Sequence, residues 1–170
     1  DDAADYIRLL LNHGSETKYK HTVIGYNSRM DGLQSAAVDV KPKYIAQWTA
    51  QRRENPAYYD EIFDNQPDII TPYAAPQARH VYHLYVISVP ENRDGVLAYL
   101  HEKGVGAGIH YPIPCHLQPA LSELGYKEGD FPQAEEAAKK IISLPMFPEL
   151  TREQMNVVSD TLRQALSVMV

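Results

Sequence analysis

The stretch Val81-Tyr-His-Leu-Tyr-Val-Ile-Ser-Val89 is rich in β-branched and aromatic residues, with apolar side chains on both faces. This pattern is typical of a strand that is covered on both sides. Asn92 follows as a helix cap, and Gly104 ends the predicted helix. Residues 105–111, with several glycines, predict a second strand. A strand, a helix and a strand imply a small sheet with helices packed on one face.

Upstream of this unit the chain opens with a predicted amphipathic helix over residues 2–13. Apolar residues recur there at helical spacing, and Gly14 stands where a left-handed C-terminal cap belongs. The polar residues 15–26 indicate a loop. Because the chain opens on Asp1 without an initiator Met, we expect it to begin within a larger domain.

The longest predicted element follows the pair Ser28 and Asp31, which has the spacing of a capping box. We therefore expect a helix to start near residue 29, and its apolar positions continue at steps of three and four to residue 62. Pro42 and Pro56 interrupt this run. Since each proline removes a helical hydrogen bond, we expect a kink or two consecutive helices.

Downstream, residues 117–124 predict a short helix, and Asp130 with Pro132 predicts the start of another. Residues 143–147 predict a brief strand. Thr151 and Gln154 repeat the capping-box spacing before a last amphipathic helix.

These elements together predict the α+β class: a small antiparallel or mixed sheet with helices on one face, preceded by long kinked helices. We expect residues 1–26 to be a remnant of a larger domain, residues 27–66 to be interdomain helices, and residues 67–170 to be a C-terminal α+β domain.

Composition excludes several classes of protein. Sixteen Lys and Arg against 22 Asp and Glu give a net charge of −6 with no basic stripe, which argues against nucleic-acid binding. The sequence contains neither an apolar run of membrane-spanning length nor the apolar h-region of a signal peptide. A single cysteine suits a reducing compartment, so we expect a cytoplasmic protein.

The densest chemistry lies in the loop 108–119, which contains His110, Tyr111, Cys115, His116 and several prolines. Prolines stiffen the loop, and a stiff loop can hold polar side chains in place. The simpler alternative is a turn whose histidines are only hydrogen-bonded. A metal site at the two histidines and Cys115 is disfavoured, because adjacent Cys115 and His116 lack the spacing of a structural zinc site.

Asn27 and Arg29 flank the predicted helix start, where free backbone amides and the positive end of the helix dipole favour an anion. The alternative is a simple helix cap beside a solvent-exposed arginine.

Several ordered motifs resemble the C-terminal portion of the DegT/DnrJ/EryC1/StrS family, and the resemblance covers nearly the whole chain. These enzymes are pyridoxal-phosphate-dependent aminotransferases that act on nucleotide-linked keto sugars in amino-sugar biosynthesis. The motifs are Gly25-Tyr-Asn-Ser-Arg-Met-Asp-Gly-Leu-Gln-Ser35, Gly108-Ile-His-Tyr-Pro-Ile-Pro114, His116-Leu-Gln-Pro119, Gly129-Asp-Phe-Pro132 and Ser143-Leu-Pro-Met-Phe-Pro148.

The resemblance implies the small C-terminal domain of an aspartate-aminotransferase-like fold, working as a homodimer. It implies that Asn27 binds the pyridoxal phosphate of the neighbouring subunit and that Arg29 lies near the phosphates of the nucleotide sugar. It also implies that His116, with His110 and Tyr111 nearby, lines the sugar pocket.

One departure limits this implication. In the family, the Schiff-base lysine and the groups that hold the cofactor ring precede the segment that matches Arg8 to Ser15. We therefore assign no catalytic residue. We expect the chain alone to be a truncated part of the enzyme that is inactive and binds no cofactor by itself. A missing N-terminal segment would be needed for activity. The alternative is a stand-alone, non-catalytic dimerisation or ligand-binding module from the same family.

Overall fold

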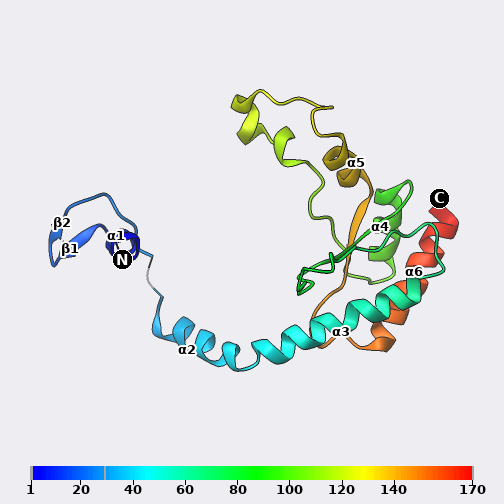
Figure 1. The fold of residues 1–170 in the computed structure, drawn as a ribbon, viewed down its shortest axis with the longest axis horizontal. Helices are drawn as coiled ribbons and strands as arrows, with labels where there is room; N and C mark the ends of the chain where they lie inside the picture. The colour runs from blue at the N-terminus through cyan, green and yellow to red at the C-terminus, as the bar shows by residue number, and fades with distance from the viewer. Residues whose placement is uncertain (1, 29, 170) are drawn as a thin grey trace. The chain divides into compact units, whose positions relative to one another are not determined.

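The computed structural model describes residues 2–28 and 30–169, and its residues form two compact units, 1–46 and 47–170. Figure 1 shows both units as a ribbon. Helices and short antiparallel strands make up both, so the α+β class is confirmed. The expected three-part division of the chain stays a prediction.

The first unit opens with α1 (Asp2–Leu11), which ends two residues earlier than the predicted helix over residues 2–13. His13 and Gly14 follow it with positive φ values of 57° and 68°. The backbone therefore enters the left-handed region at His13, one residue before the predicted position. Within the predicted loop 15–26, two short strands, β1 (Ser15–Thr17) and β2 (Lys20–His21), pair in antiparallel fashion. The prediction of a plain loop was wrong here, because backbone pairing needs no apolar alternation in so short a hairpin.

The next helix, α2 (Gly32–Val40), begins later than the capping-box spacing predicted. Asp31 itself is the N-cap, and its carboxylate accepts a hydrogen bond from the Gln34 amide at 2.9 Å. The amide of Ser28 instead donates to the Leu11 carbonyl at 3.1 Å. Asp31 is an equally good capping residue, so the motif indicated the helix but not its first residue.

The expected interruption of the long helical run is confirmed at Pro42. A 3₁₀ turn, η1 (Lys41–Lys43), contains this proline and separates α2 from α3 (Ile45–Phe63). Pro56 lies inside α3 and does not end it. The run is therefore two consecutive helices.

The sheet of the second unit pairs β3 (Tyr85–Ser88) with β4 (Ile141–Leu144) in antiparallel fashion. The prediction of a full strand over residues 105–111 was wrong. One isolated bridge, between Gly108 and Ser143, forms there. Glycines weaken a strand interior, which limits the pairing at this place. The second strand lies at residues 141–144 rather than 143–147.

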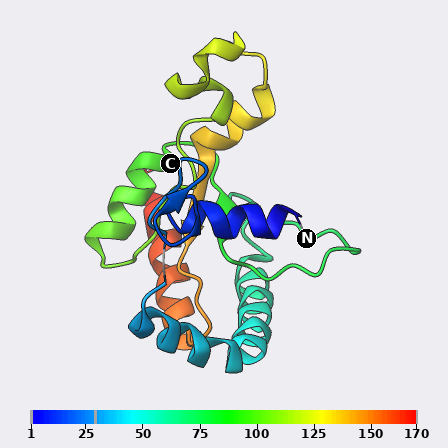
Figure 2. The same cartoon turned by 90° about the vertical axis from the view of Figure 1, so that its left-hand side faces the viewer.

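Helices complete the second unit. Asn92 caps α4 (Arg93–Glu102) by accepting from the Gly95 amide, as expected. The loop after α4 contains the 3₁₀ turns η2 (Cys115–Leu117) and η3 (Pro119–Leu124) and leads into α5 (Pro132–Lys140). The last helix is α6 (Arg152–Met169), and α4 and α6 lie side by side in Figures 1 and 2.

The second capping box is confirmed at the start of α6. The Gln154 amide donates to the hydroxyl of Thr151, and the Gln154 side chain accepts from the Thr151 amide at 3.0 Å. This reciprocal pair satisfies two backbone donors that a helix start leaves free.

The core of the second unit lies where α3, α4 and α6 meet the sheet. Five of its large side chains are completely shielded from solvent: Tyr59, Tyr85, Leu100, Ile142 and Leu162. Tyr59 and Tyr85 are in ring contact, with centroids 4.9 Å apart. Burial of these apolar surfaces stabilises the second unit and provides the base on which the polar loop 108–119 rests.

Arg52 fastens α3 to two other parts of the second unit. Its guanidinium donates to the carbonyls of Tyr82 and Met146, both at 3.1 Å. Residue 82 precedes β3 and residue 146 follows β4, and Tyr85 pairs with Leu144 in the antiparallel sheet. This one side chain therefore ties one end of the small sheet to α3. Hydrogen bonds from a charged donor are the stronger kind.

Candidate functional site

The proline-rich loop starts from a fixed point on β4. Gly108 and Ser143 exchange both backbone hydrogen bonds, at 2.7 and 3.0 Å. The Ser143 hydroxyl, on a residue that is 4% exposed, also lies 2.9 Å from Nδ1 of His110. His110 is thus held on the edge of the sheet by a side chain that the sequence analysis did not select.

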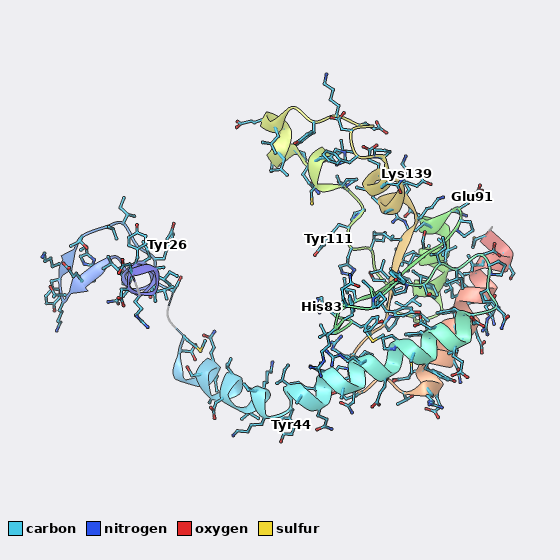
Figure 3. All side chains as sticks on the ribbon, viewed as in Figure 1. Tyr26, Tyr44, His83, Glu91, Tyr111 and Lys139 are labelled. Atoms are coloured by element: carbon cyan, nitrogen blue, oxygen red, sulfur yellow. The ribbon has the colours of Figure 1, made fainter. Side chains whose placement is uncertain are left out.

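Tyr111 follows as an exposed aromatic residue. Its side chain is 71% exposed, and its ring meets the ring of His110 edge to face at 5.5 Å between centroids. Figure 3 labels Tyr111 and His83 on the same side of the second unit. An exposed phenol next to an anchored imidazole can donate hydrogen bonds to hydroxyl or phosphate oxygens of a ligand.

His116 lies in a different environment from these two residues. Its Nε2 is 2.9 Å from the carboxylate of Glu135 on α5, and the two side chains are only 8% and 9% exposed. The ring of Phe131 packs against the imidazole at 4.8 Å between centroids. The structure therefore brings His110 and Tyr111 together, whereas His116 is paired with Glu135.

Glu135 also accepts hydrogen bonds from the backbone amides of Gly129 and Phe131. Burial acts to raise its pKa, but the amide of Gly129, the ring of His116 and the amide of Phe131 outweigh burial and lower the pKa below its ordinary value. Glu135 is therefore ionised at neutral pH. Its contribution to stability is lost only as the pH falls through this lowered pKa.

The sequence analysis missed Glu135 and Ser143. A glutamate early in a helix is ordinarily a solvated group that interacts favourably with the helix dipole, so Glu135 carried no distinctive signal. Ser143 was assigned to a strand and to a family motif, but to no site. Both residues lie far along the chain from the histidines that they contact. Rules of sequence spacing apply only to residues a few positions apart, so they could not identify these pairs.

Asn27 belongs to the first unit. Its neighbours are fixed to the end of α1, because the Tyr26 amide donates to the Leu10 carbonyl at 2.7 Å. Asn27 also forms an isolated antiparallel bridge with Asn12, and its own side chain is exposed. An exposed amide on a fixed backbone suits the binding of a phosphate oxygen. Arg29, the other expected anion ligand, lies outside the described residues.

The lysines do not fit a covalent cofactor site. Lysines that bind a carbonyl compound covalently are activated by desolvation or by a neighbouring cation. Seven of the eight lysines in the chain are exposed, and the eighth, Lys140, is half-buried and paired with Glu136 at 2.7 Å. The lysines of this chain therefore do not fit the aldehyde end of pyridoxal phosphate.

Two other properties concern only the described part of the chain. No three side chains of His, Cys, Asp or Glu gather there as candidate metal ligands, and Cys115 is exposed. None of the described helices combines the length and apolar character needed to cross a membrane.

The chain matches one protein family over nearly its whole length. Residues 1–163 match the model of the DegT/DnrJ/EryC1/StrS aminotransferase family. A pleiotropic regulatory protein of Geobacillus stearothermophilus is 43% identical over 96% of this chain and 44% of its own length. The dTDP-3-amino-3,4,6-trideoxy-alpha-D-glucose transaminase of Streptomyces venezuelae is 35% identical over 96% of this chain and 43% of its own length.

Among solved structures, S. venezuelae DesV in complex with a ketimine intermediate superimposes with a TM-score of 0.85 and 35% identity. The match covers 95% of this chain and 43% of that one. The chain thus spans less than half the length of the relatives it matches.

Proposed function

Since the chain belongs to the DegT/DnrJ/EryC1/StrS aminotransferase family, we propose that it is the C-terminal part of a pyridoxal-phosphate-dependent aminotransferase acting on nucleotide-linked keto sugars. The observation that carries this proposal is the 35% identity, over 96% of the chain, to a relative that is a dTDP-amino-sugar transaminase. We also propose a cytoplasmic location, which the single cysteine favours.

In this proposal the cofactor supplies the electron sink, and the chain supplies binding and orientation. Asn27 donates to the cofactor phosphate, and Arg29 neutralises the phosphates of the nucleotide. His110 binds the sugar through Nε2, because Nδ1 is occupied by Ser143. The exposed hydroxyl of Tyr111 binds next to it. His116 lines the same pocket while Glu135 holds its ring.

The chain alone does not transaminate in this proposal. Covalent catalysis needs an activated lysine, and every lysine of the chain is exposed or ion-paired. A missing N-terminal segment, in the same or a separate chain, supplies that lysine.

A second copy of the chain is the proposed partner. None of the residues of α2 is buried, and Leu33 on this helix is 84% exposed. Ile24 and Tyr26, which flank Asn27 on the upstream side, are 95% and 68% exposed. Apolar surface of this kind marks an interaction site. The same surface also favours the second candidate function, a non-catalytic dimerisation or ligand-binding module.

Sugar-nucleotide binding is tested with dTDP-glucose as the probe and the isotope-labelled chain observed by NMR. We expect saturable shifts at His110 and Tyr111, and Tyr111→Ala should raise the Kd about tenfold by removing the hydroxyl and the ring. Tyr73→Ala is the matched control, because Tyr73 is an 84% exposed tyrosine of the same unit. No saturable binding by the unmodified chain, or equal binding by both variants, would contradict the proposed site.

Self-association is tested by sedimentation equilibrium over a range of concentrations. We expect reversible dimers, and Leu33→Asp should weaken the dimer by about tenfold or more, since it places a charge in the apolar surface. Ser35→Asp adds the same charge to the same helix without removing an apolar side chain, and it should retain dimers. A chain that stays monomeric at high concentration would show that α2 is not a dimer surface.

A further inference from the structure

The residues between Val105 and Glu135 form the longest segment of the second unit in which no residue is buried. Both of these residues are buried, and none of the residues 106–134 is. Figure 1 shows the yellow-green part of this 106–134 segment reaching away from α4 and α6, and Figure 2 agrees. Leu124 and Tyr126 within it are 62% and 47% exposed. Apolar burial therefore cannot fix the conformation of this segment.

Two polar anchors replace the missing core. The first is Ser143, which holds the start of the segment through Gly108 and His110. The second is the carboxylate of Glu135, which lies at the far end. It contacts His116, so the pair links two positions that are 19 residues apart in the sequence.

The carboxylate of Glu135 accepts hydrogen bonds from three separate residues of the segment. Its Oε1 accepts from Nε2 of His116 at 2.9 Å, from the amide of Gly129 at 2.9 Å and from the amide of Phe131 at 3.3 Å. Its Oε2 lies 3.0 Å from the same Gly129 amide. Hydrogen bonds to an ionised acceptor are stronger than neutral ones, and burial shields them from water.

The same contact determines which ring nitrogen of His116 faces the carboxylate with a hydrogen. An ionised carboxylate can only accept, so the hydrogen of the pair must reside on Nε2 of the imidazole. Phe131 packs against the ring at 4.8 Å between centroids, which restricts its rotation. One side chain therefore sets the tautomer and the orientation of a candidate sugar-binding histidine.

We infer that Glu135 is a positioning residue: it orients His116 and holds the turn 127–131, so that residues 115–131 present a fixed surface to the nucleotide sugar. Ser143 likewise orients His110 at the other end of the segment. The role of the surface rests on the proposed function, whereas the anchoring itself does not.

The test uses three variants of the labelled chain. Glu135→Ala removes the anchor. Glu135→Gln keeps an acceptor oxygen of nearly the same shape. Glu136→Ala is the matched control, because its carboxylate is on the adjacent residue and pairs with Lys140 on the exposed side of α5.

Amide hydrogen exchange and the imidazole nitrogen signals of His116 are the readouts. In Glu135→Ala we expect the amides of Gly129 and Phe131 to exchange at least about tenfold faster. The Nε2–H signature of His116 should disappear as well. Glu135→Gln should restore that signature and part of the protection, and Glu136→Ala should match the unmodified chain.

Amides of β3 and β4 report on the core and should keep their protection in every variant. The inference is overturned if Glu135→Ala leaves Gly129 and His116 unchanged. It is also overturned if protection falls equally in β3 and β4, since Glu135 would then be a general stabiliser rather than a positioning residue. Failure of Glu135→Gln to restore the His116 signature would overturn it too.

A titration with dTDP-glucose separates this inference from the proposed function. Amide hydrogen exchange and the imidazole signals of His116 are measured without ligand, so these two readouts test the anchoring alone. If the unmodified chain binds the probe, Glu135→Ala should raise the Kd about tenfold and Glu136→Ala should not. Equal binding by both variants would overturn the positioning role, and absence of binding by the unmodified chain would overturn the proposed function only.

Discussion

Leu162→Ala should lower the free energy of unfolding of the second unit by about 2–5 kcal/mol. Leu162 is completely shielded from solvent on α6 and belongs to the core that also contains Leu100 and Ile142. Truncation removes buried apolar atoms and leaves a cavity that neighbouring helices fill only in part. With a urea slope of about 1–3 kcal/mol per M, the midpoint of unfolding should fall by about 0.7 M or more.

Val157→Ala is the matched control for this measurement. Val157 lies on the same helix and is 59% exposed, so its truncation should change stability by less than about 0.5 kcal/mol. If the two variants unfold at the same urea concentration, α6 does not pack into the core in the way described.

Pyridoxal phosphate followed by borohydride reduction should leave the mass of the chain without a site-specific adduct. A covalent cofactor lysine must be distinguished from others by desolvation or by a nearby cation. All eight lysines of the chain are exposed or ion-paired, so none is selected over the rest. Intact mass at one equivalent of cofactor, followed by peptide mapping, should show at most weak labelling spread over several lysines.

A full-length transaminase of the family, treated in parallel, is the positive control for this reduction. Substitution of Lys140 by Arg tests the half-buried lysine, and the labelling pattern should not change. One lysine labelled stoichiometrically in the unmodified chain would refute the proposal that the chain alone cannot catalyse transamination.

Local rules of sequence determined much of the secondary structure. Asn92 and the pair Thr151 and Gln154 each stand at the helix end that their capping chemistry indicated. Pro42 separates two helices as expected, because a proline acts on its own turn of the chain. These effects extend over three or four residues, which is why they can be read directly from the chain.

The order of the motifs also determined the family, since such a series of matches needs no three-dimensional information. The errors arose where two local options were equally good. Asp31 rather than Ser28 caps α2, and the glycine-rich residues 105–111 form one bridge instead of a strand. In both places propensity allowed the alternative, and contacts with distant residues selected between them.

Only the tertiary structure decided the environment of each candidate site residue. His110 meets Ser143 across 33 positions, and His116 meets Glu135 across 19. Arg52 reaches the carbonyl of Met146 across 94 positions. Such pairs join residues that lie far apart along the chain, so periodicity and spacing contain no signal for them. The sequence alone therefore named the loop and its histidines, and packing determined which histidine is exposed near Tyr111 and which is buried against a carboxylate.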